Sequence, residues 1–130
     1  MARILAVEDA NELITFYRRV FHQHKVIAVG TAWDAIATLE RDHDFDLVLL
    51  DMHLPEVSGM VVLQHIRKMP TGKVMNVFVI SADDSLRSRA ELVGIQHWMT
   101  KPVEIDELMD AAEPYLKAEA SGQDAATPRP

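Results

Sequence analysis

The chain has no cysteine among its 130 residues, which excludes disulfide scaffolds and metal sites built on thiolates. No apolar run approaches the ~20 residues that a membrane-spanning helix needs, and the N-terminus becomes polar too soon for a signal peptide. Basic residues are also few, since 13 Lys and Arg stand against 20 Asp and Glu, a net charge of −7. Phosphate neutralisation needs clustered Lys and Arg. These absences favour a cytoplasmic protein that binds neither nucleic acid nor a membrane.

What is present is the composition of an ordinary globular domain. Hydrophobic residues make up 48% of the chain and charged residues 25%, and a chain of this length can bury a real core. Five short apolar runs, rich in Val, Ile and Leu, alternate with stretches in which apolar residues recur at helical spacing. The runs span residues 4–7, 26–29, 47–50, 77–80 and, more weakly, 97–99. They do not alternate polar with apolar side chains, which is typical of strands buried on both faces of a parallel sheet.

The order of these segments predicts the fold class. Strand and helix alternate five times, which indicates a single doubly wound α/β domain with right-handed crossovers. Thr31 and Ser58 are placed to cap the second and third helices. A short helix is expected within residues 84–92, where apolar residues are fewer.

The C-terminal end departs from this pattern. Pro114 should kink or end the last helix, because proline removes a backbone donor. Beyond Leu116 the residues are small and polar and finish in Pro-Arg-Pro. We therefore expect the domain to span residues 1–117 and residues 118–130 to form a disordered tail or the start of a linker.

Polar residues follow four of the five expected strands. Glu8 and Asp9 follow the first strand and Asp51 the third, while Ser81 follows the fourth and Lys101 lies just after the fifth. In an open α/β sheet, ligands bind beyond the carboxyl ends of the strands, where the strand order reverses. If the order is 2-1-3-4-5, the reversal lies between the first and third strands. Three carboxylates would then converge in one pocket.

Carboxylates this close together cannot all stay ionised without a compensating charge. A divalent cation with oxygen ligands, Mg²⁺ (or Mn²⁺), would supply that charge and keep water ligands for exchange with a phosphate group. Lys101 is a second compensating charge, on a flexible stem. With the Ser81 hydroxyl added, the site suits phosphoryl transfer onto Asp51, a reaction that depends mainly on positioning and charge neutralisation.

Four short motifs, each at a strand end, together resemble the receiver domain of two-component response regulators. They are Val-Glu-Asp at 7–9, Leu-Leu-Asp-Met-His-Leu-Pro at 49–55 with Gly59, Ile-Ser-Ala at 80–82 and Thr-Lys-Pro at 100–102. The resemblance covers nearly the whole chain, about residues 3–116. It implies a flavodoxin-like sheet of five strands in the order 2-1-3-4-5. It also implies a phosphorelay signalling protein that promotes only its own phosphorylation and dephosphorylation, and so is not an enzyme in the usual sense.

The resemblance further implies a role for each residue around the acceptor. Asp51 would take a phosphoryl group from a sensor histidine kinase or phosphotransfer protein in a Mg²⁺-dependent reaction. Glu8 and Asp9 would bind the metal together with Asp51 and the backbone carbonyl of Met52. Lys101 would bind the phosphoryl group.

Other residues would couple phosphorylation to a change of shape. Ser81 stands where the family has its switch hydroxyl, and Trp98 stands at the switch aromatic position, where Tyr or Phe is more usual. The surface formed by residues 84–116 would then alter its contact with an output domain, a downstream protein or a second copy of the chain. His53 and Asp83 occupy the two positions that tune the lifetime of the aspartyl phosphate.

Three other functions fit the same fold less well. Haloacid-dehalogenase-like phosphatases also use an Asp at a strand end, but they typically carry a second Asp where this chain has His53. A flavodoxin-like cofactor binder needs a loop rich in Gly, Ser or Thr after the first strand, whereas residues 8–12 would repel a phosphate. A degenerate receiver, used only as a binding surface, would not need the full set of site residues.

Each side chain also has a structural interpretation. Asp51 and Lys101 could be solvated loop charges, Ser81 could cap the next helix, and Trp98 could simply pack at the sheet edge. The combination favours the functional interpretation, because clustered charge in a cleft rarely serves packing. The six histidines are scattered, so a histidine metal site is not expected. Which kinase acts on the chain, and whether the chain stands alone, stays open at this point.

Overall fold

The computed structural model describes residues 1–70 and 74–125, with side chains placed through residue 116. Five strands alternate with five helices along these residues. The strands are β1 (Arg3–Val7), β2 (Lys25–Val29), β3 (Leu47–Leu50), β4 (Val77–Ser81) and β5 (His97–Thr100). The helices are α1 (Asn11–Val20), α2 (Ala32–Arg41), α3 (Gly59–Lys68), α4 (Arg87–Val93) and α5 (Ile105–Ala125).

The strands form one parallel sheet in the order β2-β1-β3-β4-β5. This confirms the predicted doubly wound architecture, including the reversal of strand order between β1 and β3. Val7 at the end of β1 pairs with Leu50 at the end of β3. The residues that follow these two strands therefore emerge side by side at the carboxyl edge of the sheet.

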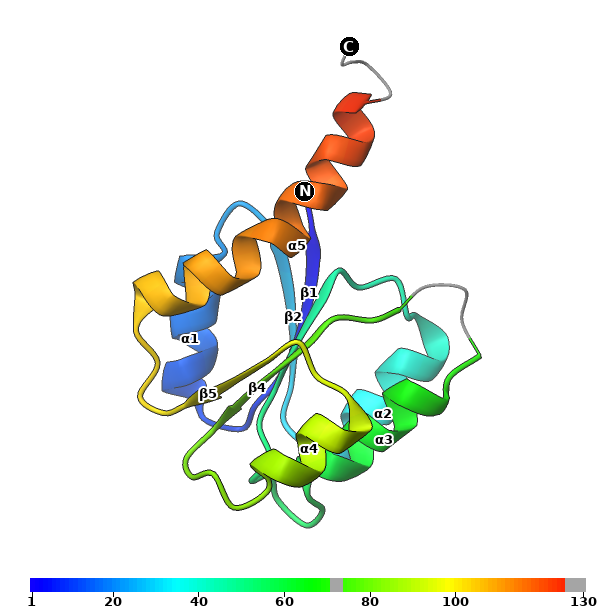
Figure 1. The fold of residues 1–130 in the computed structure, drawn as a ribbon, viewed down its shortest axis with the longest axis vertical. Coiled ribbons are helices and arrows are strands. Elements are labelled where there is room, and N and C mark those ends of the chain that lie inside the picture. The colour runs from blue at the N-terminus through cyan, green and yellow to red at the C-terminus, as the bar shows by residue number, and fades with distance from the viewer. Residues whose placement is uncertain (71–73, 126–130) are drawn as a thin grey trace.

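Helices cover both faces of the sheet, which explains why the strands do not alternate polar with apolar residues. α1 and α5 lie on one face, and α2, α3 and α4 lie on the other (Figure 1). Successive residues of β1 divide between two buried clusters. Leu5 and Val7 belong to the cluster that includes α2 and α3 residues, whereas Ile4 and Ala6 belong to the cluster that includes α1 and α5 residues.

Both predicted helix caps are confirmed. The Thr31 side chain accepts a hydrogen bond from the backbone N–H of Asp34 at 3.0 Å, and the Ser58 side chain accepts one from the N–H of Met60 at 3.1 Å. Each bond satisfies one of the N–H groups that a helix start leaves without a partner. The second cap fixes where α3 leaves the loop that follows β3.

The fourth helix begins later than the predicted span of residues 84–92, because a local turn precedes it. The Asp83 carboxylate accepts bonds from the N–H of Ser85 at 2.9 Å and from its hydroxyl at 2.6 Å. Such side-chain bonds compete with helix formation, so α4 starts only at Arg87. Ser81 is the last residue of β4 and is separated from this helix by the turn. Capping of the next helix is therefore not the role of Ser81.

The last helix does not end at Pro114. α5 continues to Ala125, and its last turns point away from the sheet (Figure 1). Pro114 is exposed, so water can bond the carbonyl group that the proline leaves without a donor. Residues 118–125 of the expected tail or linker thus belong to α5 and include several good helix formers, while residues 126–130 lie outside the described part. None of the described helices is long and apolar enough to cross a membrane.

Candidate functional site

Three carboxylates meet at the carboxyl edge of β1 and β3, as predicted. One oxygen from each of Glu8, Asp9 and Asp51 lies within 4.8 Å of the others. Glu8 and Asp51 are 1% and 4% exposed, whereas Asp9 is open to solvent. The hydrogen bonds of the sheet extend to the backbones of Glu8 and Asp51. The N–H of Asp51 donates to the carbonyl of Val7 at 3.0 Å, and the N–H of Glu8 donates to the carbonyl of Val29 at 2.9 Å. The two buried carboxylates are thus positioned by the rigid sheet.

Lys101 brings a positive charge to this cluster. Its Nζ lies 3.1 Å from Oε1 of Glu8 and 3.2 Å from Oδ2 of Asp51. Its backbone N–H donates to the Ser81 carbonyl at 2.7 Å, and the peptide bond to Pro102 is cis. Burial lowers the pKa of Lys101, but its contacts with the two carboxylates outweigh burial and raise the pKa overall. The ammonium group therefore stays charged beside Asp51.

One ammonium group does not balance three carboxylates. Burial raises the pKa of Glu8, and repulsion from Asp51 acts in the same direction. The N–H of Ala10, at 3.1 Å from Oε2, and the ammonium of Lys101 favour the charged form without restoring the usual pKa. The excess of negative charge is what a divalent cation with oxygen ligands would compensate.

The Ser81 hydroxyl is buried at the end of β4. Ser81 is 0% exposed, and its Oγ makes no hydrogen bond within the described part of the chain. A buried polar group left unpaired costs about 1–3 kcal/mol, so a native example calls for an explanation. Ser81 ends β4, which pairs with β3 directly before Asp51. Ser81 therefore lies at the same carboxyl edge of the sheet as Asp51, with its hydroxyl free to donate.

The loop after β3 packs directly on the backbone of Asp51. The N–H of Gly59 donates to the carbonyl of Met52 at 2.9 Å. A Cβ at Gly59 would lie 2.1 Å from the carbonyl oxygen of Asp51, so no larger residue fits without a shift of the backbone. Glu56, in the same loop, has a positive φ of 71°, which non-glycine residues adopt uncommonly. The start of α3 thus fixes the backbone that carries Asp51.

Comparison with known proteins identifies the family to which the chain belongs. The sequence model of the family described as the response regulator receiver domain matches residues 4–113. The chain belongs to this family. The response regulator ArlR of Staphylococcus saprophyticus is 28% identical to the receiver over 120 residues, which are 90% of this chain and 53% of the relative. The receiver thus spans about half the length of the curated relatives that it matches.

Solved structures agree with this assignment. The signal receiver domain of a LuxO repressor protein from Vibrio parahaemolyticus is 27% identical, with a TM-score of 0.79 over 94% of this chain and 95% of that one. The phosphorylated cyanobacterial phytochrome response regulator RcpA is 25% identical, with a TM-score of 0.77 over 90% and 95% of the two chains. The receiver is therefore part of two-component signalling, and its family consists of signalling phosphoacceptors.

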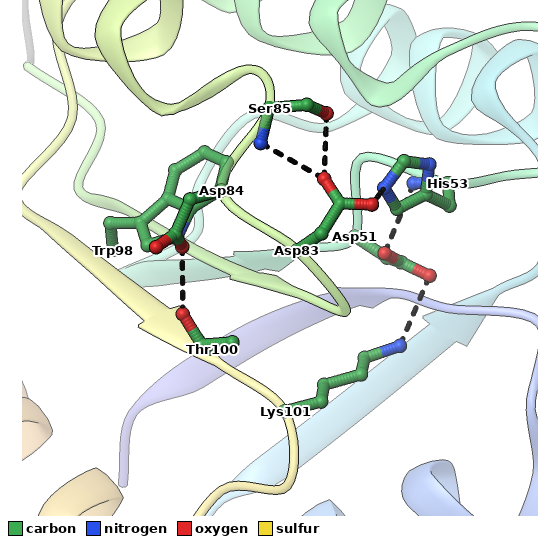
Figure 2. A network of polar contacts seen from close by, with 8 residues as sticks. All are labelled: Asp51, His53, Asp83, Asp84, Ser85, Trp98, Thr100 and Lys101. Carbon is green, nitrogen blue, oxygen red and sulfur yellow. Dashed lines mark hydrogen bonds and ion pairs between the residues drawn. The ribbon is translucent and has the colours of Figure 1, made fainter.

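At the rim of the receiver site, the structure brings His53 and Asp83 together. The backbone N–H of His53 donates to Oδ1 of Asp51 at 3.1 Å, and its Nε2 lies 3.2 Å from Oδ2 of Asp83 (Figure 2). Hydrogen bonds from Ser85, followed by the charge and the bond of His53, lower the pKa of Asp83. This rim pair therefore joins the loop after β3 to the loop after β4, beside Asp51.

Asp84 is a residue of the site that sequence analysis missed. Its Oδ1 accepts a hydrogen bond from the indole N–H of Trp98 at 2.9 Å and another from the hydroxyl of Thr100 at 2.8 Å (Figure 2). Trp98 itself is half-buried on β5. Positions 84 and 98 share no motif, so only the fold reveals that Trp98 is bonded to the loop after β4.

Proposed function

We propose that this receiver accepts a phosphoryl group on Asp51 from a histidine kinase or a phosphotransfer protein. The observation that carries the proposal is the set of groups around Asp51. They are the carboxylates of Glu8 and Asp9, the ammonium of Lys101 and the unpartnered hydroxyl of Ser81. The phosphorylated relative RcpA, which shares the fold at 25% identity, supports the same assignment.

In the proposed reaction, a carboxylate oxygen of Asp51 attacks the phosphorus atom of a phosphohistidine. A new P–O bond forms while the P–N bond breaks, and the electron pair of that bond stays on the leaving imidazole nitrogen. Lys101, now bonded to Oδ2 of Asp51, would follow the negative charge onto a phosphoryl oxygen. The Ser81 hydroxyl would donate to a second one. Catalysis by such groups rests on positioning and on charges already in place.

A divalent cation fits the same site. Glu8, Asp9 and Asp51 offer the oxygen ligands that Mg²⁺ prefers, and exposed Asp9 leaves room for water ligands. We propose Mg²⁺ here, or Mn²⁺ in its place, with the Met52 carbonyl as a further ligand. That carbonyl already accepts from the N–H of Gly59 and keeps its second lone pair. When bound, the ion would supply positive charge between the carboxylates and the phosphoryl oxygens.

Magnesium binding should depend on Asp9. Mg²⁺ should bind with about millimolar affinity, because most of its ligands would be water. Asp9→Asn should weaken binding on the order of tenfold, measured by titration of Trp98 fluorescence in a Trp33→Phe background. Glu113→Gln removes an exposed carboxylate of α5 outside the cluster and serves as the control. Equal affinity in the parent and Asp9→Asn proteins would remove Asp9 from the metal site.

We further propose that the rim pair sets the lifetime of the aspartyl phosphate. His53 and Asp83 lie 3.2 Å apart beside Asp51, where they can hinder the approach of water. Loss of either side chain should shorten the lifetime several-fold, measured as the decay of phosphorylated protein in His53→Ala and Asp83→Ala. Asp34→Ala, which removes an exposed carboxylate of α2, is the control. Decay as slow as in the parent would exclude the pair from this role.

Phosphorylation would then be transmitted by Ser81 and Trp98. A phosphoryl group adds about −1.5 to −2 charge beside the Ser81 hydroxyl, which would move to donate to it and draw the loop after β4 along. Trp98 would respond, and the surface of residues 84–116 would present a different face to an output domain, a downstream protein or a second copy of the chain. A Ser81→Ala variant that changes Trp98 fluorescence on phosphorylation as the parent does would exclude this coupling.

We place the protein in the cytoplasm with its kinase.

A further inference from the structure

We propose that Asp84 is a positioning residue that holds Trp98 in the conformer of the unphosphorylated receiver. Phosphorylation of Asp51 must then break the contact between Asp84 and Trp98. The inference rests on the proposed function of Asp51. It adds a residue that the motifs of the family do not include and assigns it control over how easily the receiver switches.

The first support is the geometry of the contact. A single oxygen, Oδ1 of Asp84, accepts from both the Trp98 indole N–H at 2.9 Å and the Thr100 hydroxyl at 2.8 Å. Hydrogen bonds to an ionised acceptor are roughly twice as strong as neutral ones. Thr100 is the last residue of β5 and pairs with Ser81 in the sheet. Its hydroxyl therefore belongs to the rigid part of the site and orients the carboxylate toward Trp98.

The second support is the way the loop after β4 is held. Figure 2 shows the carboxylates of Asp83 and Asp84 pointing in opposite directions. The first reaches His53 on the loop after β3, and the second reaches Trp98 on β5. The loop is thus fastened on both sides in the conformer seen here. Movement of Ser81 toward a phosphoryl group would shift the adjoining loop and strain the bond between Asp84 and Trp98.

The third support is the chemistry of tryptophan at this position. The indole N–H is a donor at the edge of a large apolar ring, and the ring of Trp98 packs against the cluster on the α2–α4 face. Phenylalanine has no donor to offer Asp84. The contact therefore needs an aromatic residue that carries a donor, as Trp98 does.

The contact predicts a measurable restraint. If Asp84 stabilises the conformer that does not bind phosphoryl groups, the apparent affinity for a phosphoryl analogue is reduced by the population of that conformer. Loss of Asp84 should therefore tighten binding, because the restraint is gone. A residue with a merely structural role would have the opposite effect, since local disorder weakens binding.

The experiment titrates the receiver with beryllium fluoride, a non-covalent phosphoryl analogue, in the presence of Mg²⁺, and follows bound ligand by fluorine NMR. Asp84→Ala should lower the apparent Kd by about three- to tenfold, the factor that corresponds to one hydrogen bond of ordinary net strength. Asp84→Asn keeps an acceptor oxygen for Trp98 and Thr100 and should stay closer to the parent than Asp84→Ala does. An unchanged or weaker affinity in Asp84→Ala would overturn the proposal.

A second background tests whether Asp84 acts through the indole. In Trp98→Phe, which removes the donor and keeps an aromatic ring, the further substitution Asp84→Ala should change the Kd by less than about twofold. A full effect in that background would mean that Asp84 does not act through Trp98. If the parent itself fails to bind beryllium fluoride with Mg²⁺, the proposed function of Asp51 fails instead, whichever residue stands at position 84.

Discussion

A Lys101→Ala receiver should take up phosphoryl groups at least about 100-fold more slowly than the parent, the effect expected when one preorganised charge is removed from a site of charge development. The ammonium lies 3.2 Å from Oδ2 of Asp51, the oxygen that we expect to face the incoming phosphorus. Without it, the donor would approach an acidic cluster whose excess charge only the metal offsets. The initial rate of phosphorylation by acetyl phosphate at saturating Mg²⁺ is the measurement.

The same substitution removes the cation from two buried carboxylates, so its effect on folding must be separated from its effect on the reaction. Glu8 and Asp51 would lose the cation that contacts both of them in a buried site, and removing one partner of such a pair costs about 3–5 kcal/mol. Mg²⁺ should restore much of this loss, whereas it should not restore the rate. Lys68→Ala, on the exposed side of α3, is the matched control. A rate within about threefold of the parent at saturating Mg²⁺ would show that Lys101 does not assist the transfer.

Gly59→Ala should destabilise the receiver by about 3 kcal/mol or more, at the upper end of the cost of overpacking. The added Cβ would lie 2.1 Å from the carbonyl oxygen of Asp51 and 3.0 Å from the Cα of Met52, both of them backbone atoms that cannot swing aside. The backbone of Asp51 must move or α3 must pull back. The free energy of unfolding in urea measures the loss.

Gly30→Ala is the control for this effect. Its new Cβ would meet the Glu8 carbonyl oxygen at 3.9 Å and the Cα of Asp9 at 4.0 Å, which is ordinary van der Waals contact. Its stability should stay within about 0.5 kcal/mol of the parent. If both variants lost the same free energy of unfolding, the cause would be the replacement of any glycine by alanine, and not the close approach of α3 to Asp51.

The sequence predicted the sheet and the acidic cluster for the same reason. β1, β3 and β4 are apolar runs buried on both faces, and polar residues stand directly at their ends, so strand order alone brings Glu8, Asp9 and Asp51 together. The unpartnered hydroxyl of Ser81 and the reach of Lys101 follow from the same edge of the sheet. Residues whose place is determined by the backbone of the sheet were therefore predictable.

Features that depend on loop conformation were not. The turn that Asp83 makes with Ser85 delays the start of α4, and local propensity does not show it. The bond between Asp84 and Trp98 joins residues 14 apart and exists only because the loop folds back to β5. The continuation of α5 through Pro114 was not predicted, because proline costs the helix less where water can replace the lost hydrogen bond, as at this exposed position.

The central claim is that Asp51 accepts the phosphoryl group with the help of a divalent cation. The most direct measurement incubates the receiver with acetyl phosphate, with and without Mg²⁺, and traps the acyl phosphate with borohydride, which reduces the modified aspartate to homoserine. Peptide mass spectrometry then locates the converted residue. We expect conversion of Asp51 only when Mg²⁺ is present, and none in Asp51→Asn. Conversion at Asp9 or another carboxylate, or equal conversion without Mg²⁺, would contradict the account.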